Sequence, residues 1–237
     1  MMAILLRPRR SIFLHETVHA SGAFNYQVCR LPVPSRLNIP LWRTLLADYE
    51  DNIVCDYLEF GWPVGYLRDS LPVTQQRNHH GALLFPKAID KYLRTEPSYG
   101  AVLGPFESNP FSSDIVLSPL NSIPKGDSER RIIVDLSWPI GSSVNDGIPS
   151  KQCLGVDFQL VYPTVDDVAA PILALGPGCL LFKRDLQRAY RQSPVDPGDY
   201  HLHGYSWCDH MFFDTVLPMG LPAVQHMCSS QDRKSVV

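Results

Sequence analysis

The feature that most limits the fold of this chain is its content of proline, 21 residues among 237. Proline fixes its own φ angle and offers no amide hydrogen, so it interrupts helices and is kept out of central strands. Long regular elements are therefore disfavoured, and short helices and strands joined by many loops are expected. A hydrophobic content of 45% is still sufficient for such elements to pack around a core.

Composition narrows the class of protein further. The formal net charge is −3, so any contact with a nucleic acid has to come from local basic clusters. The six cysteines form no CxxC pair, which indicates reduced and mostly buried thiols. No stretch approaches the roughly 18 apolar residues of a membrane span, and the start of the chain lacks the pattern of a signal peptide. We expect a soluble intracellular protein without membrane contact, and the compartment, cytoplasm or nucleus, stays open.

Apolar periodicity predicts helices in the first half of the chain. Apolar residues at three- and four-residue steps predict one amphipathic helix from Pro40 to a stop at Gly61-Trp62-Pro63. A second helix is expected from Pro86 up to the residue before Pro97. Residues 1–39 lack a strong period and are expected to form an irregular extension.

Two stretches have the pattern of β-hairpins. Strands are predicted over Leu117–Ile123 and Arg131–Leu136, with a tip at Lys125-Gly126-Asp127-Ser128. A second pair of alternating strands, Tyr200–Trp207 and Met211–Leu217, flanks the turn Cys208-Asp209-His210. Each pair is expected to be antiparallel, because a short turn can join only neighbouring strands that run in opposite directions.

The region between the hairpins combines loop, helix and strand signals. Residues 137–160 have the composition of a long loop. Thr164 and Asp167 stand at capping-box spacing and predict the start of a helix. A strand is then expected over Cys179–Asp185, and Leu217–Gly220 is expected to lead into a further helix. Helices and hairpins in this order predict an α+β fold rather than regular βαβ winding.

Asp185, at the end of the predicted strand, is the first candidate for chemistry. A carboxylate at a rigid strand end suits Mg²⁺, which binds one or two carboxylates together with phosphate oxygens. Backbone amides of the following turn suit a triphosphate, and Tyr190 would stand beside the sugar. The plainer alternative is that Asp185 only caps a helix and Tyr190 packs below it. This segment alone leaves both interpretations open.

Four blocks of sequence extend the argument: IPKGDSERRIIVDLS, LLFKRDLQRAYRQSPVDP, HGYSW and LPMGL, in this order. Together they resemble the reverse transcriptase family, RNA-directed DNA polymerases, and especially retrotransposon polymerases of the DIRS-like kind. The stretches VCDYLEFGWPVGY and GAVLGPFESNPF are also similar to that group, so the resemblance spans roughly residues 50–228. It implies the fingers and a partial palm of the right-hand polymerase fold, with helices packed on an incomplete antiparallel palm sheet.

The resemblance divides the chain into four regions. The irregular N-terminal extension covers residues 1–39, and a helical region follows over 40–98. A fingers-like hairpin and loop occupy 99–160, beginning with turn-rich sequence. A partial palm occupies 161–237.

The first palm motif of the family falls on the block around Asp185. The resemblance implies that Asp185 is a catalytic carboxylate that binds Mg²⁺, assisted by the carbonyl of Leu186. The backbone at Arg188 and Ala189 would face the triphosphate. Tyr190 would be the gate that reads the sugar.

Two other blocks carry implied nucleotide contacts. Lys125 and Arg131 match basic residues of the fingers hairpin that hold phosphates, a role suited to a point charge and a guanidinium fork. Met219 and Gly220 match the segment that floors the nucleotide pocket, where a glycine permits close backbone approach. The implied ligands are a deoxynucleoside triphosphate and an RNA or DNA template-primer.

The sequence also departs from the family. A second palm motif with two adjacent aspartates is missing after Asp185, since the Asp166-Asp167 pair precedes it. The residues after LPMGL, with Pro222 first, also depart from the pattern, and no thumb follows. We therefore expect a truncated domain that does not polymerise alone and that depends on a further palm or thumb segment or on a partner chain.

Two alternatives to the polymerase fragment stay open. One is a non-enzymatic domesticated or decaying fragment that binds nucleic acid or a protein partner. The other, a metal-dependent hydrolase that uses His201 or His203, lacks a visible second ligand cluster.

Overall fold

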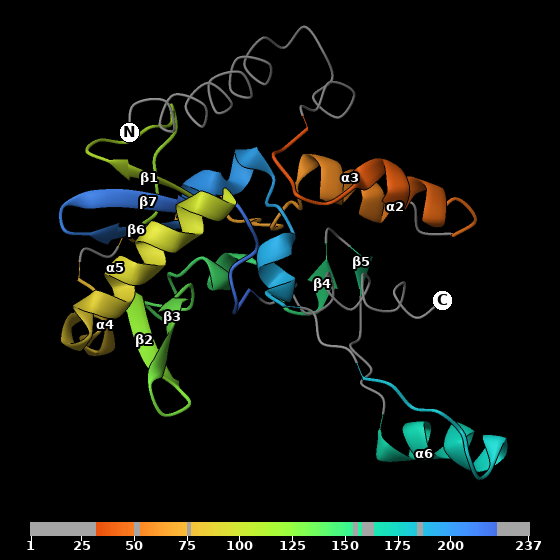
Figure 1. The fold of residues 1–237 in the computed structure, drawn as a ribbon. Coiled ribbons are helices and arrows are strands. Elements are labelled where there is room, and N and C mark those ends of the chain that lie inside the picture. Colours follow the sequence, from red (N-terminus) through yellow and green to blue (C-terminus); the bar gives the residue numbers. More distant parts are fainter. Residues whose placement is uncertain are drawn as a thin grey trace, which may run out of the picture.

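Short helices and small antiparallel sheets make up the fold (Figure 1). The computed structural model describes residues 32–49, 53–74, 77–153, 156–157, 164–183 and 187–221. Its α-helices are α2 (Ile39–Leu45), α3 (Ile53–Phe60), α4 (His80–Leu84), α5 (Pro86–Thr95) and α6 (Val165–Leu175). Short 3₁₀ turns are η1 (Glu96–Tyr99), η2 (Asn145–Gly147), η3 (Ala189–Gln192) and η4 (Pro197–Leu202). The strands are β1 (Val102–Phe106), β2 (Leu120–Lys125), β3 (Glu129–Val134), β4 (Gln152–Cys153), β5 (Val156–Asp157), β6 (Gly204–Trp207) and β7 (His210–Asp214).

The strands form three small sheets, all with antiparallel pairing. The largest has the order β1-β7-β6, and β2-β3 and β4-β5 form two-stranded ribbons. The predicted α+β class is confirmed, and both hairpins form with strand bounds that differ from the predicted ones. In the second hairpin, residues 200–202 belong to η4 and residues 215–217 lie beyond the end of β7. The second hairpin turns at Cys208 and Asp209, whose positive φ angles of 48° and 61° suit a two-residue hairpin tip. The β1-β7-β6 sheet joins a strand of the 99–160 region to two strands of the 161–237 region.

One core of buried apolar side chains extends from α3 and α5 to the three-stranded sheet and the β2-β3 hairpin. Trp207 Nε1 of β6 donates a hydrogen bond to Asp90 Oδ1 of α5 at 2.9 Å, which fixes the helix on the sheet. The fully buried large apolar side chains come from helices, strands and connections alike: Leu58, Ile89, Phe106, Leu120, Leu202, Tyr205, Phe213 and Leu217. Within the described ranges, no helix has the length and apolar character needed to cross a membrane.

The predicted helix from Pro40 to residue 61 is wrong in one respect, because the structure divides it into α2 and α3. Asn38 caps α2 by accepting a hydrogen bond from the Leu41 amide at 3.2 Å, and the helix ends at Leu46, where ψ is 16°. Arg43 of α2 bridges to the carboxylates of α3. Apolar spacing persists through both helices, since Ile39 and Trp42 of α2 pack partly buried against the core that also buries α3, so periodicity alone does not show the break.

Strand β1 was not predicted, since its sequence VLGPF carries a glycine and a proline. The register with β7 shifts between Leu103 and Phe106, so Gly104 and Pro105 lie in an irregular stretch of the ladder. A proline is tolerated there because the bulge needs no amide donor from it. The pairing with β7, more than a hundred residues away, makes this segment a strand.

The predicted helix caps are confirmed, and the strand predicted after α6 is wrong. Thr164 and Asp167 form the expected capping box at the start of α6. Residues 179–183 form no strand, and Leu180, Leu181 and Phe182 are 95%, 70% and 87% exposed. A strand needs a neighbour for its ladder hydrogen bonds, and no described residue pairs with this segment. The predictions for residues 1–31, 184–186 and the helix after Leu221 lie outside the described residues.

Gly61 provides a test of the packing between α3 and the segment that precedes η4. Its φ is +96°, and a Cβ there would meet the backbone of Val195 and Asp196. We expect Gly61→Ala to lower the free energy of unfolding by about 2–4 kcal/mol, from the strained φ and the overpacking together. Gly100→Ala is the control, since its φ is +73° but its Cβ would meet nothing within 4 Å. Urea unfolding that gives the two variants equal losses would contradict the packing argument.

Candidate functional site

The β2-β3 hairpin separates its two neighbouring arginines. Arg130 stacks over the Phe85 ring, with its guanidinium carbon 3.6 Å from the ring centroid. Its Nε and Nη2 donate to the hydroxyl and the carbonyl of Ser122, at 2.9 and 2.6 Å. Because side chains alternate along a strand, Arg131 lies on the other face, where it is exposed. Arg130 therefore packs the hairpin against Phe85, the residue after α4, whereas the Arg131 side chain is exposed.

Lys125 ends β2 beside the hairpin tip, which projects away from the sheet in Figure 1. Its Nζ lies 3.2 Å from Glu129 Oε2, and both side chains are more than half exposed. An exposed ion pair of this kind contributes about 0–1 kcal/mol, so it does not lock the lysine in place. Lys125 and Arg131 thus remain candidates for phosphate contacts.

The turn over residues 187–192 carries the described part of the predicted nucleotide block. Arg188 adopts the left-handed conformation, with φ 58° and ψ 37°, and precedes the 3₁₀ turn η3. Gln192 Nε2 closes the turn by donating to the Gln187 carbonyl at 2.6 Å. Tyr190 is half-buried against the core. The predicted metal-binding residues, Asp185 and Leu186, lie outside the described residues.

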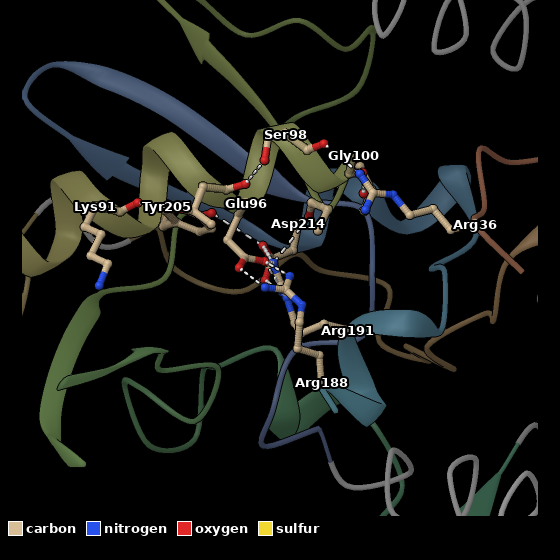
Figure 2. Close-up of polar contacts among 12 residues, drawn as sticks. Arg36, Lys91, Glu96, Ser98, Gly100, Arg188, Arg191, Tyr205 and Asp214 are labelled. Carbon is tan, nitrogen blue, oxygen red and sulfur yellow. Dashed lines mark hydrogen bonds and ion pairs between the residues drawn. The ribbon is translucent and has the colours of Figure 1, made fainter. Parts of the chain in front are cut away.

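A cluster of charged side chains ties this turn to η1 and β7 (Figure 2). Glu96 of η1 accepts a two-pronged ion pair from Arg188, with Nη1–Oε1 at 2.8 Å and Nη2–Oε2 at 2.7 Å. Its Oε2 also accepts from Arg191 Nε and Nη2, at 3.2 and 3.0 Å. Arg191 in turn contacts both carboxylate oxygens of Asp214 in β7, at 2.7 and 3.1 Å. The Tyr205 hydroxyl lies 3.4 Å from Asp214 Oδ1.

The cluster balances two positive and two negative side chains in a place with little solvent. The side chains of Glu96 and Asp214 are 7% and 2% exposed, and that of Arg191 is 15% exposed. Burial by itself lowers the pKa of Arg191, but the carboxylates of Asp214 and Glu96 outweigh it and hold the pKa above its usual value. Sequence reasoning missed both acids, because nothing in the sequence relates an acid at position 96 to an arginine at position 191.

The segment before LPMGL runs beside the segment that follows Tyr190. The Val195 amide donates to the Thr215 carbonyl at 2.9 Å, and the Leu217 amide donates to the Ser193 carbonyl at 2.8 Å. The Ser193 amide itself donates to the Tyr190 carbonyl at 3.2 Å. The block that contains Tyr190 and the LPMGL block are therefore neighbours in the fold, although they are separated in the sequence.

Asn145 connects the LPMGL block to the end of the hairpin block, and sequence reasoning missed it. Its Nδ2 donates to Ser137 Oγ at 2.7 Å and to the Gly220 carbonyl at 2.8 Å. Its own amide donates to the Leu136 carbonyl at 2.9 Å. Among the described residues, no hydrogen bond or ion pair joins Lys125 or Arg131 to this junction.

Met219 and Gly220 lie at an exposed turn. Met219 is 45% exposed, and Gly220 has a φ of +102°. A Cβ on Gly220 would meet nothing within 4 Å, so its backbone conformation, rather than crowding by other atoms of the chain, requires glycine there. Roles of these residues in binding a nucleotide stay predictions.

The described residues do not supply the donors that a two-metal site needs. They contain no group of three or more histidine, cysteine, aspartate or glutamate side chains placed to hold a metal ion. The nearby acids Glu96 and Asp214 are already paired with arginines. The predicted ligands Asp185 and Leu186 lie outside the described residues, so the Mg²⁺ that the family resemblance implies stays a prediction, and no step through a metal is derived.

Comparison with known proteins finds similarity at the level of solved structures. No protein-family model and no curated protein matches the sequence. A prototype foamy virus protease-reverse transcriptase is 18% identical, with a TM-score of 0.47, over 84% of this chain and 25% of that chain. A foamy viral protease-reverse transcriptase in complex with an RNA/DNA hybrid is 14% identical, with a TM-score of 0.47, over 86% of this chain and 28% of that chain.

A third similar structure is the foamy viral enzyme in complex with double-stranded DNA. It is 13% identical, with a TM-score of 0.46, over 85% of this chain and 36% of that chain. The chain thus spans between a quarter and about a third of the length of these proteins. Similarity of this degree concerns only the general arrangement of helices and strands.

Proposed function

We propose that the chain is a partial reverse transcriptase domain of a retroelement of the DIRS-like kind, with fingers and the first half of a palm. The parent activity would be RNA-directed DNA synthesis by two-metal nucleotidyl transfer. One observation carries the proposal: three sequence blocks that resemble the family converge at one place. The 187–195 segment lies beside Leu217, and Asn145 fastens the end of the hairpin block to Gly220.

The turn at 187–190 is proposed to face the triphosphate with its backbone. Arg188 commits its guanidinium to Glu96, so the backbone rather than this side chain is left to meet a ligand. A left-handed residue followed by right-handed ones turns successive amides to one side, an arrangement that suits an anion. Tyr190, held against the core, is proposed as the sugar gate.

The hairpin is proposed to contact phosphates of the nucleotide or the template-primer through Lys125 and Arg131. Both side chains are exposed, and neither is buried in a structural ion pair. Phosphate contacts of this kind release counterions, so they make binding salt-dependent.

We expect Lys125→Glu with Arg131→Glu to weaken binding of an RNA/DNA primer-template at least about tenfold and to reduce the salt slope by about 2. Fluorescence anisotropy at several salt concentrations measures both quantities. The control is Lys87→Glu with Arg94→Glu, which makes the same charge change on exposed positions of α5. Equal losses in the two double variants would show that net charge, not the hairpin, decides binding.

This chain alone is proposed to be inactive in synthesis and to depend on a further palm or thumb segment or on a partner chain. The sequence has no adjacent aspartates after Asp185, and loss of one member of a catalytic unit costs orders of magnitude in rate. Large apolar side chains left exposed along α6 and residues 180–182 support the dependence.

Primer extension on poly(rA)/oligo(dT) with Mg²⁺ tests the inactivity. We expect no product, and clear synthesis by the pure chain would overturn this part of the proposal while supporting the family. Binding of the primer-template that is salt-dependent but independent of Mg²⁺ would favour the non-enzymatic alternative. No binding at all would count against both.

A further inference from the structure

We propose that Glu96 is a positioning residue for the 187–192 turn. Its carboxylate draws two guanidinium groups of the turn to the side facing η1, and thereby sets the direction of the turn's amides and of Tyr190. The consequence for a nucleotide rests on the proposed function. The positioning itself rests only on the geometry of the cluster in Figure 2.

The Glu96 carboxylate uses both of its oxygens on this turn. Oε1 accepts from Arg188, and Oε2 accepts from both Arg188 and Arg191, with distances of 2.7–3.2 Å. Parallel N–H···O bonds of the fork type fix direction as well as distance. The acid is nearly inaccessible to solvent, so these donors replace water that it has lost.

The backbone of Arg188 needs such support. A residue other than glycine seldom adopts the left-handed conformation, because its Cβ crowds the following carbonyl. Arg188 holds φ 58° with its guanidinium anchored at Glu96 and stacked 4.2 Å from the centroid of the Tyr99 ring. Without the anchor, the turn is free to return to a right-handed conformation and to redirect the amides that follow.

The platform that carries Glu96 is itself fixed. The Ala101 amide donates to the Glu96 carbonyl at 3.2 Å, and the Thr215 amide donates to the Ala101 carbonyl at 3.1 Å, so η1 is tied to the sheet. Arg36 approaches the same Tyr99 ring, at 4.9 Å, and donates to the Ser98 carbonyl at 3.1 Å. Glu96 can therefore act as a rigid reference for a turn that lies more than ninety residues later.

The two arginines depend on Glu96 unequally. Arg191 is also held by Asp214, whereas Glu96 is the carboxylate that Arg188 contacts among the described residues. In Glu96→Gln, Asp214 is the carboxylate that remains for the two guanidinium groups. The glutamine side chain has a single acceptor oxygen, so it cannot accept the hydrogen bonds of both arginines. Arg188 is then the group released toward the proposed ligand side of the turn.

Hydrogen-deuterium exchange of the full chain tests the positioning without any ligand. In Glu96→Gln, we expect amides of a peptide covering 187–193 to exchange at least tenfold faster, with the β6-β7 peptides changed less than twofold. Adding Arg188→Gln to this variant should increase exchange by less than a further twofold, because both changes remove the same contact. Unchanged exchange at 187–193, or equal acceleration in β6-β7, would overturn the proposal.

Glu96→Asp keeps the test decisive if the glutamine variant does not fold. The aspartate retains the charge but is one methylene shorter, so it loses the fork geometry and should give an intermediate acceleration at 187–193. Exchange identical to that of the parent chain would overturn the proposal. Asp90→Asn is the matched control, since it weakens the contact of α5 with Trp207 without touching the turn.

A nucleotide measurement separates this inference from the proposed function. With Mg²⁺-dUTP and Mg²⁺-UTP as probes, which differ only in the 2′-hydroxyl, we expect Glu96→Gln to weaken dUTP binding at least tenfold and to reduce the preference for dUTP over UTP, because Tyr190 is no longer held. If the parent chain binds neither probe, the result counts against the proposed function. The positioning role of Glu96 is then decided by the hydrogen-deuterium exchange experiment alone. A variant with faster exchange and an unaltered preference would overturn the link between Glu96 and Tyr190.

Discussion

Arg191→Ala is expected to lower the free energy of unfolding by about 3–5 kcal/mol. The change leaves Asp214 without its guanidinium partner and removes two of the hydrogen bonds that Glu96 accepts. Both acids are almost completely shielded from solvent, so water cannot replace the lost donors. The cost is therefore that of an unpaired buried charge rather than that of one hydrogen bond.

The control for this prediction is Arg43→Ala, in the ion pairs that join α2 to α3. Arg43 contacts Asp56 and Glu59 at 2.7 and 2.6 Å, but its side chain is 43% exposed. Its loss should cost no more than about 1 kcal/mol, because water solvates the remaining acids. Urea unfolding of both variants measures the difference. Similar losses for the two would mean that the buried cluster is not a principal source of stability.

His203→Leu is expected to change how stability responds to acid. His203 is fully buried, neither ring nitrogen has a hydrogen-bond partner among the described residues, and burial lowers its pKa to about 3, with His201 and Arg191 adding to the effect. Between pH 6.5 and about 3 the unfolded chain takes up a proton at this residue and the folded chain does not, so stability is lost as pH falls. Relative to the parent chain, the leucine variant should gain about 3 kcal/mol on going from pH 7 to pH 4.

Asp199 titrates with the opposite sign and has to be tested beside His203. Burial raises the pKa of its carboxyl to about 6, although the Val64 amide donates to it and opposes the shift. The protonated carboxyl of Asp199 therefore favours the folded chain below the ordinary pKa of 3.8, and this stability is lost as pH rises through the folded pKa of about 6. Asp199→Asn, whose amide oxygen can accept the same bond, should gain about 3 kcal/mol over the parent chain at pH 8 and little at pH 4. Parallel pH profiles for the parent and both variants would contradict the two assignments.

Features fixed within a few residues were predicted correctly. The capping box at Thr164, the start of α5 at Pro86 and the tip at Cys208 and Asp209 all follow from neighbouring side chains and backbone preferences. The α+β class follows from the order of such local signals. The candidate phosphate contacts Lys125 and Arg131 remain predictions, and the structure adds that Arg130 beside them is engaged with Phe85.

The two errors about strands share one physical origin, since each depends on residues distant in the sequence. β1 forms despite Pro105 because β7 supplies a partner, and residues 179–183 stay exposed although their apolar run predicts a strand. A strand is defined by its ladder, and the sequence of one segment does not say whether a second edge is present.

By itself, the sequence determined the capping box of α6, the start of α5, the hairpin turns and the four blocks that resemble a polymerase, because capping and turn geometry act over a few residues. Only the tertiary structure decided that Glu96, Arg191 and Asp214 meet in one buried cluster and that Asn145 joins two blocks. The pairing of the three charged side chains depends on desolvation, which exists only after η1, the 187–192 turn and β7 have packed together.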